Sequence, residues 1–123
     1  MSQSDLFAPL SFKRGPAMKN RFMLAPLTNQ QSHPDGTLSE DEFHWLTLRA
    51  KGGFGLTMTC AAHVQAIGQG FAGQLGIFSD KHLPGLTRLA AAIKADDSLA
   101  VVDRKSTRLN SSHSSVSRMP SSA

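Results

Sequence analysis

Three short apolar runs alternate with two helical patterns along this chain, and this alternation limits the possible folds more than any other feature. The apolar runs are residues 21–25, 55–60 and 99–102. Short, continuously apolar runs are typical of strands buried on both faces, and a helix between two such strands returns the chain to start a parallel neighbour. The order strand, helix, strand, helix, strand therefore predicts βαβ units in a parallel sheet covered by helices.

The boundaries of both helices can be predicted from their end residues. The first helix begins at Ser39, whose spacing to Glu42 predicts a capping box, and it ends at the glycine pair 52–53. The second begins at residue 79 or 80 and carries Pro84 in its first turns. Apolar residues recur at helical spacing in each helix: Phe43, Leu46 and Ala50 in the first, and Leu86, Leu89, Ala90 and Ile93 in the second.

Two kinds of fold contain such units, an open doubly wound sheet and a (β/α)₈ TIM barrel. An open sheet that binds dinucleotides needs a G-x-G-x-x-G pattern after its first strand, and residues 27–38 contain only Gly36. The connections after the first two strands are long, as they are at the active face of a barrel. We therefore expect an α/β chain that forms the first third of a TIM barrel, with an amino-terminal β-hairpin at residues 10–21 and truncation after the third strand.

The composition changes after Val102. Residues 103–123 contain eight serines and few apolar side chains, so they cannot offset the entropy cost of their own ordering. The strings DRKSTRLNSSH and SRMPSSA within them also resemble a translated sequencing-library adapter. We therefore divide the chain into a partial barrel domain at residues 1–102 and a non-native, disordered, Ser-rich tail at residues 103–123.

The charge and the amino terminus argue against several classes of function. Three of the four net positive charges lie in the tail, so no basic surface of residues 1–102 favours a nucleic-acid partner. The start lacks the pattern of a signal peptide, and no apolar run is long enough to cross a membrane. Cys60 is the one cysteine, which excludes an internal disulfide framework. We expect a cytoplasmic protein with a small-molecule substrate and no membrane partner.

Three segments carry a family resemblance: residues 6–32, LFAPLSFKRGPAMKNRFMLAPLTNQQS; residues 35–64, DGTLSEDEFHWLTLRAKGGFGLTMTCAAHV; and residues 78–94, FSDKHLPGLTRLAAAIK. In this order they resemble the amino-terminal part of the Old Yellow Enzyme family, the FMN-dependent NADH:flavin oxidoreductases. The resemblance covers residues 6–102, which amounts to a third or less of the family's barrel. It implies that the hairpin is a lid over the bottom of the barrel and that residues 1–102 are a partial FMN-binding domain.

The resemblance also implies roles for individual residues. Ala25, Pro26, Leu27 and Thr28 would pack against the flavin ring at the end of the first strand, and the Thr28 hydroxyl would lie near flavin N5 and O4. Ala61 resembles the small residue whose backbone N–H faces flavin O4. Gln30 falls where some relatives place a substrate-contacting side chain. A strand terminator at Pro26 and an ordinary loop hydroxyl at Thr28 remain alternative interpretations.

The resemblance implies a reaction in which NADH or NADPH reduces FMN, which then reduces the activated C=C bond of an α,β-unsaturated carbonyl compound. The family's catalytic residues lie on later strands, so we expect none in this chain and no turnover by it. Relatives usually have a flavin-binding Gln where Asp103 stands. Alternative interpretations are a fragment of a dienoyl-reductase-like flavin enzyme and a small non-catalytic α/β binding module.

Two residue types are interpreted as structural. Cys60 is predicted to be a small buried apolar residue, because nothing near it in the sequence lowers the pKa of its thiol. The histidines within residues 1–102 do not have the spacing of metal ligands, and we predict surface or packing roles for four of them and no metal site: His33, His44, His63 and His82.

Overall fold

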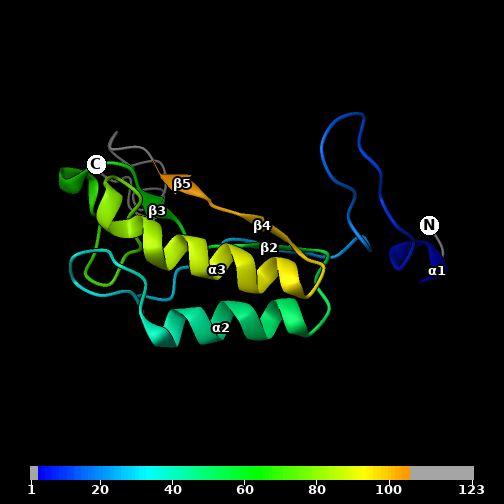
Figure 1. Ribbon diagram of the computed structural model, residues 1–123, viewed down its shortest axis with the longest axis horizontal. Helices are drawn as coiled ribbons and strands as arrows, with labels where there is room; N and C mark the ends of the chain where they lie inside the picture. The colour runs from blue at the N-terminus through cyan, green and yellow to red at the C-terminus, as the bar shows by residue number, and fades with distance from the viewer. Residues whose placement is uncertain (1–2, 106–123) are drawn as a thin grey trace, which may run out of the picture.

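The computed structural model describes residues 3–105 as one sheet-and-helix unit with a short amino-terminal extension (Figure 1). In chain order, its elements are α1 (Gln3–Leu6), β1 (Met23–Leu24), α2 (Glu40–Lys51), β2 (Leu56–Met58), β3 (Ala62–His63), a 3₁₀ turn (Ala66–Gly68), a second 3₁₀ turn (Asp80–His82), α3 (Leu83–Ala95), β4 (Leu99–Val101) and β5 (Arg104–Lys105). Within this part of the chain, no helix has both the length and the apolarity that a membrane span needs.

The main sheet contains three parallel strands in the order β1-β2-β4. Helix α2 connects β1 to β2, and α3 connects β2 to β4. This topology confirms the two predicted βαβ units. Since all three strands run in the same direction, the connections that follow them leave the sheet at one common edge, which is at the left of Figure 1. We call this edge the carboxyl edge.

A second, two-stranded sheet extends the carboxyl edge. Strands β3 and β5 pair in parallel, with Ala62 opposite Arg104. The Ala62 N–H donates to the Asp103 carbonyl across 2.8 Å. Strand pairing therefore continues beyond Val102, through the first three residues of the predicted tail. The rest of that tail, residues 106–123, lies outside the described residues.

Helices α2 and α3 lie side by side and form one layer over the sheet (Figure 1). Their facing residues make the main apolar core, in which four side chains are at most 2% exposed: Leu46, Ala50, Leu89 and Ile93. Each of these lies on a helical face that the sequence pattern predicts to be apolar. Leu24 and Ala100 pack against this core from the sheet side.

Two predicted elements differ from the structure. The first strand is confined to Met23–Leu24, and the Met23 side chain is 49% exposed, so the run 21–25 is not a strand buried on both faces. In the described part, the helix layer covers one face of the sheet and leaves Met23 on the other. The hairpin at residues 10–21 is reduced to one antiparallel bridge between Leu10 and Met18, with Gly15 at a φ of +91° in the turn.

Candidate functional site

Two connections meet at the carboxyl edge, and together they form the candidate site. Residues 25–38 follow β1, and residues 64–82 follow β3 on the way to α3. The Ser32 N–H donates to the Gly73 carbonyl at 3.0 Å, and the Gly76 N–H donates to the Gly36 carbonyl at 2.8 Å. The Gln69 side chain adds a bond to the Pro34 carbonyl. The two connections are thus held to each other by hydrogen bonds.

The four residues predicted to contact the flavin ring after the first strand lie directly beyond β1. Ala25, Pro26, Leu27 and Thr28 are all exposed, with the Leu27 side chain 58% accessible. Within residues 3–105, no protein group forms a hydrogen bond with the Thr28 hydroxyl. This segment therefore presents small and apolar side chains, and one available hydroxyl, at the edge of the sheet.

Ala61 lies between β2 and β3, at the same edge and half-buried. Its carbonyl accepts a hydrogen bond from Gln74 Nε2 at 3.1 Å. The preceding carbonyl, that of Cys60, accepts from Thr59 Oγ1 at 2.8 Å. No residue in the described range accepts a hydrogen bond from the Ala61 N–H. Hydrogen bonds to the Cys60 and Ala61 carbonyls thus hold the backbone on both sides of the Ala61 N–H, and this N–H is available to a ligand.

Gln30, the predicted substrate-contacting residue, has a backbone φ of +56° and an exposed side chain. A side chain on Gly73 would place its Cβ 2.3 Å from the Gln30 carbonyl oxygen. The backbone of the second connection therefore passes directly over the Gln30 backbone, which is possible only because residue 73 is glycine. The structure brings Gln30 to the junction of the two connections and leaves its side chain toward solvent.

A buried polar network lies beneath this junction. Glu42, in the first turn of α2, is fully buried, and its carboxylate accepts from Ser32 Oγ at 2.6 Å and from Cys60 Sγ at 2.9 Å. The network joins the first connection, α2 and the end of β2. Burial, and then the neighbouring Glu42, raise the pKa of the Cys60 thiol. Cys60 is therefore a buried thiol rather than a reactive thiolate, as predicted from the sequence.

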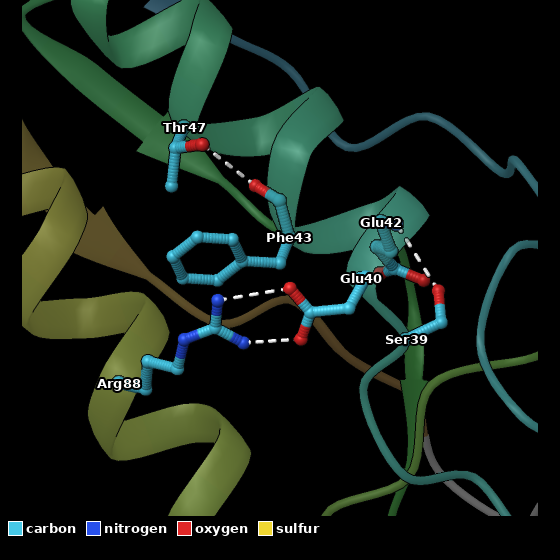
Figure 2. A network of polar contacts seen from close by, with 6 residues as sticks. All are labelled: Ser39, Glu40, Glu42, Phe43, Thr47 and Arg88. Carbon is cyan, nitrogen blue, oxygen red and sulfur yellow. Dashed lines mark hydrogen bonds and ion pairs between the residues drawn. The ribbon is translucent and has the colours of Figure 1, made fainter.

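The capping box predicted at the start of α2 is half right. Ser39 is the N-cap, and its hydroxyl accepts from the Glu42 N–H at 3.1 Å (Figure 2). The Glu42 side chain does not return this bond. Its carboxylate has two buried donors in the protein interior, and a buried carboxylate without donors would be costly.

The outer side of the same helix turn carries a different contact. Glu40 forms a two-pronged ion pair with Arg88 of α3, whose guanidinium also lies over the Phe43 ring at 3.7 Å (Figure 2). This pair is exposed and joins α2 to α3 at the surface of the helix layer. It contributes to the helix layer and is not part of the site.

Several residues that shape the site were not predicted from the sequence. They are Ser32, Glu42, Thr59 and Gln74, all of them polar and all of them buried. Gln74 lies in a stretch, residues 73–76, that the structure buries, and the sequence carries no pattern that indicates this. Ser32 and Glu42 are partners ten residues apart, and Thr59 meets the Asp103 N–H 44 residues away, so no local pattern indicates these contacts.

The residues at this edge fit a planar ligand with polar atoms at its rim, such as a flavin. The fit rests on two hydrogen-bond donors, the Thr28 hydroxyl and the Ala61 N–H. Both are without a partner among the described residues, and both belong to residues at the carboxyl edge. The exposed, small side chains of Ala25 and Pro26 leave room for a flat group beside them. The arrangement is that of a barrel-type ligand site built at the carboxyl ends of parallel strands.

Comparison with known proteins identifies the family. The chain matches the NADH:flavin oxidoreductase / NADH oxidase family over residues 5–120. It is 42% identical over 97 residues to the probable NADH-dependent flavin oxidoreductase YqiG of Bacillus subtilis, a match that covers 79% of this chain and 26% of that protein. It is 32% identical over 126 residues to the NADH:acrylate oxidoreductase of Vibrio harveyi, covering 98% of this chain and 12% of that one.

Solved structures also resemble this chain. A 2-naphthoyl-CoA reductase in complex with 2-naphthoyl-CoA superposes with a TM-score of 0.78 at 30% identity, over 82% of this chain and 15% of the other. The old yellow enzyme from Trypanosoma cruzi superposes with a TM-score of 0.71 at 26% identity, over 82% of this chain and 26% of the other. The α/β unit described above is therefore part of an Old Yellow Enzyme type of TIM barrel.

The chain belongs to the NADH:flavin oxidoreductase / NADH oxidase family, whose members are NAD(P)H-dependent flavin oxidoreductases. It spans about a quarter or less of the length of the relatives given above. The family resemblance seen in the sequence is thereby confirmed, and so is the choice of a barrel over an open dinucleotide-binding sheet.

Proposed function

We propose that this chain provides one side of an FMN site in an oxidoreductase that takes a hydride from NADH or NADPH and reduces an activated C=C bond. The observation that carries the proposal is the convergence of residues 25–28 and Ala61 at the carboxyl edge of parallel strands, in a chain that belongs to a flavin oxidoreductase family. Catalytic, ligand-binding loops of barrel enzymes lie at this edge.

The chain's residues would act by binding and orienting. When bound, FMN supplies the hydride chemistry between the nicotinamide and the alkene. Ala25, Pro26 and Leu27 offer a flat surface of small and apolar groups, which also excludes water from one face of the ring. The Thr28 hydroxyl and the Ala61 N–H are donors placed for polar atoms at the rim, where preorganised donors stabilise charge that develops during reduction.

The names of three relatives support one class of substrate. Two of them are named for small unsaturated acids, an NADH:acrylate oxidoreductase and an NADH:fumarate oxidoreductase, and a third is a 2-naphthoyl-CoA reductase. All three names describe unsaturated carbon conjugated with a carbonyl or carboxyl group. These names support α,β-unsaturated carbonyl compounds as substrates. Gln30, exposed at the junction of the two connections, would face them there.

We expect the 123-residue chain by itself to give no turnover, because the resemblance assigns none of its residues to protonation or to substrate activation. A chain that forms a complete small binding module would instead bind a ligand without redox chemistry. A dienoyl-reductase-like enzyme would share the flavin edge and differ outside it. Flavin binding by the chain separates the proposal from the binding module. Substrate choice of the complete enzyme separates it from the dienoyl reductase.

Titration of the purified chain with FMN, followed by flavin fluorescence and visible absorption, tests the proposal. Saturable micromolar binding is expected. Ala61→Leu should weaken binding about tenfold or more, since its side chain would occupy space beside the N–H. The matched control is Ala91→Leu, at an exposed position of α3, which should bind like the wild type. Absence of binding by the wild-type chain would contradict the proposal for this chain.

A further inference from the structure

We infer that Thr59 and Gln74 are positioning residues that set the direction of the Ala61 N–H, and so determine how strongly the site favours a flavin carrying extra negative charge. This inference rests on the proposed function. It goes beyond it by assigning roles to two buried side chains that touch neither the cofactor nor the substrate in the proposal.

The peptide unit before Ala61 is held by Thr59. The Thr59 hydroxyl donates to the Cys60 carbonyl at 2.8 Å and accepts from the Asp103 N–H at 3.2 Å. The hydroxyl is thereby held between the end of β2 and the residues after β4. No peptide bond in the described chain is cis, and in a planar trans peptide the N–H points opposite to the preceding carbonyl. Holding the Cys60 carbonyl therefore directs the Ala61 N–H away from Thr59.

The peptide unit after Ala61 is held by Gln74 and by the sheet. Gln74 Nε2 donates to the Ala61 carbonyl at 3.1 Å, while Gln74 Oε1 accepts from the Gly70 N–H at 2.7 Å. The following N–H, that of Ala62, donates to the Asp103 carbonyl at 2.8 Å. Both polar groups of this peptide unit therefore have partners, and so both backbone torsions of Ala61 are constrained.

The two side chains are well suited to hold a backbone group still. Thr59 is 2% exposed and Gln74 is 3% exposed, so water does not compete for their hydrogen bonds. Each uses both a donor and an acceptor function, which fixes its own rotamer. The Cys60 side chain between them is also held, by its bond to Glu42. Among the described residues the Ala61 N–H has no acceptor, while the Cys60 and Ala61 carbonyls on either side of it are both hydrogen-bonded.

A donor held in place before a ligand binds requires no reorganisation when charge develops on that ligand. A reduced flavin carries more negative charge at its rim than an oxidised one. A fixed N–H should therefore favour the reduced form over the oxidised form. A loosened N–H would still allow binding of the oxidised flavin, but with less preference for the reduced one.

The chain offers matched variants for a test. Thr59→Val and Gln74→Leu remove the two holding bonds, while Thr59→Ser retains a hydroxyl and Gln74→Met retains the side-chain length without a donor. Gln69→Leu is the control for Gln74, because Gln69 lies in the same connection and donates to the Pro34 carbonyl instead.

Thr57→Val is the control for Thr59. Thr57 is a fully buried residue of β2, and its hydroxyl bonds to Ser98.

The first measurement is the direction of the Ala61 N–H in the chain without flavin, from residual dipolar couplings. We expect a changed or averaged coupling for Ala61 in Thr59→Val and Gln74→Leu, recovery in Thr59→Ser, and wild-type couplings in Thr57→Val and Gln69→Leu. An Ala61 coupling that stays unchanged in both holding variants would overturn the inference, whether or not the chain binds FMN. If Gln74→Leu does not fold, Gln74→Met supplies the same test, since a thioether cannot donate to the Ala61 carbonyl.

The second measurement is the affinity for oxidised and reduced FMN, together with the midpoint potential of the bound flavin. Gln74→Leu should lose about tenfold in affinity for reduced FMN and much less for oxidised FMN, so that the potential becomes more negative. Equal losses for both forms would indicate a purely structural role and overturn the inference while leaving the proposed function intact. Failure of the wild-type chain to bind either form contradicts the proposed function, and the dipolar couplings still decide the inference.

Discussion

The helix layer and the carboxyl edge of the sheet are held together by different kinds of contact. The helices pack together through apolar side chains that are at most 2% exposed, such as Leu46 and Ile93. The carboxyl edge is held by hydrogen bonds of buried polar side chains, among them Glu42, Thr59 and Gln74. These apolar and polar side chains are all at most 3% exposed, so the difference between them lies in the chemistry of their contacts.

The two kinds of contact respond differently to sequence change. Apolar packing is nondirectional, so it tolerates substitutions that conserve volume. A buried hydrogen bond is directional, and removing one partner leaves the other without compensation. The helix layer can therefore vary while its function as a support is kept. The carboxyl edge holds the backbone atoms that would meet a ligand, and it requires particular partners at particular atoms.

The largest expected effect is at the contact between the two connections. Gly73→Ala should lower the free energy of unfolding by about 4 kcal/mol, because Gly73 has a φ of +82° and its Cβ would lie 2.3 Å from the Gln30 carbonyl oxygen. Gly15→Ala is the control, since Gly15 has a φ of +91° with no atom within 4 Å of the added Cβ. Urea unfolding of both variants separates collision from backbone strain. Equal losses would show that the close approach to Gln30 is unimportant.

The helix layer should respond by cavity formation. Leu46→Ala is expected to cost about 3 kcal/mol of unfolding free energy, because Leu46 is fully buried between α2 and α3. Leu48, two residues along the same helix, is 49% exposed, and Leu48→Ala should change stability by well under 1 kcal/mol. Leu46→Met should retain most of the stability, as expected for a nondirectional contact. A loss for Leu46→Met as large as for Leu46→Ala would contradict the comparison.

Two carboxylates in the first turn of α2 test the polar side of the comparison. Glu42→Gln should cost about 2 kcal/mol, because an amide nitrogen replaces one of the two oxygens that accept from Ser32 and Cys60. Glu40→Gln should have no effect above experimental error, because its pair with Arg88 is exposed to solvent (Figure 2). Thermal unfolding of both variants at low and high salt is the measurement. A larger loss for Glu40→Gln would reverse the interpretation of the two contacts.

The sequence predicted the helix layer well because its contacts are periodic. Leu46, Ala50, Leu89 and Ile93 recur at helical spacing and are all buried. The candidate site was predicted through family resemblance. The structure places residues 25–28 and Ala61 at one edge of the sheet, and their contact with a flavin stays a prediction.

The groups that hold the site were missed, since their partners are distant. The Asp103 N–H that meets Thr59 lies 44 residues away. The capping motif indicated the correct helix start but the wrong role for the Glu42 carboxylate. Its side-chain partners are set by the way that three elements come together in space.

The smallest expected effect is a pH dependence at the junction between the second connection and α3. His82 is 3% exposed, neither of its ring nitrogens has a partner within residues 3–105, and its ring lies against Phe78. Burial, followed by the nearby Lys81, lowers the pKa of His82, while Asp35 acts in the opposite direction.

A lowered pKa in the folded state means that the unfolded chain binds the proton more tightly. Stability from His82 is then complete above about pH 6.5, its unfolded value, and decreases as the pH falls below it. Urea unfolding between pH 8 and pH 5 should show a smaller decline in His82→Gln than in the wild type. His44→Gln, at an exposed position of α2, should keep the wild-type slope. A steeper decline in His82→Gln would mean that the buried imidazole gains a partner on protonation, and the carboxyl edge would then hold a buried positive charge at low pH.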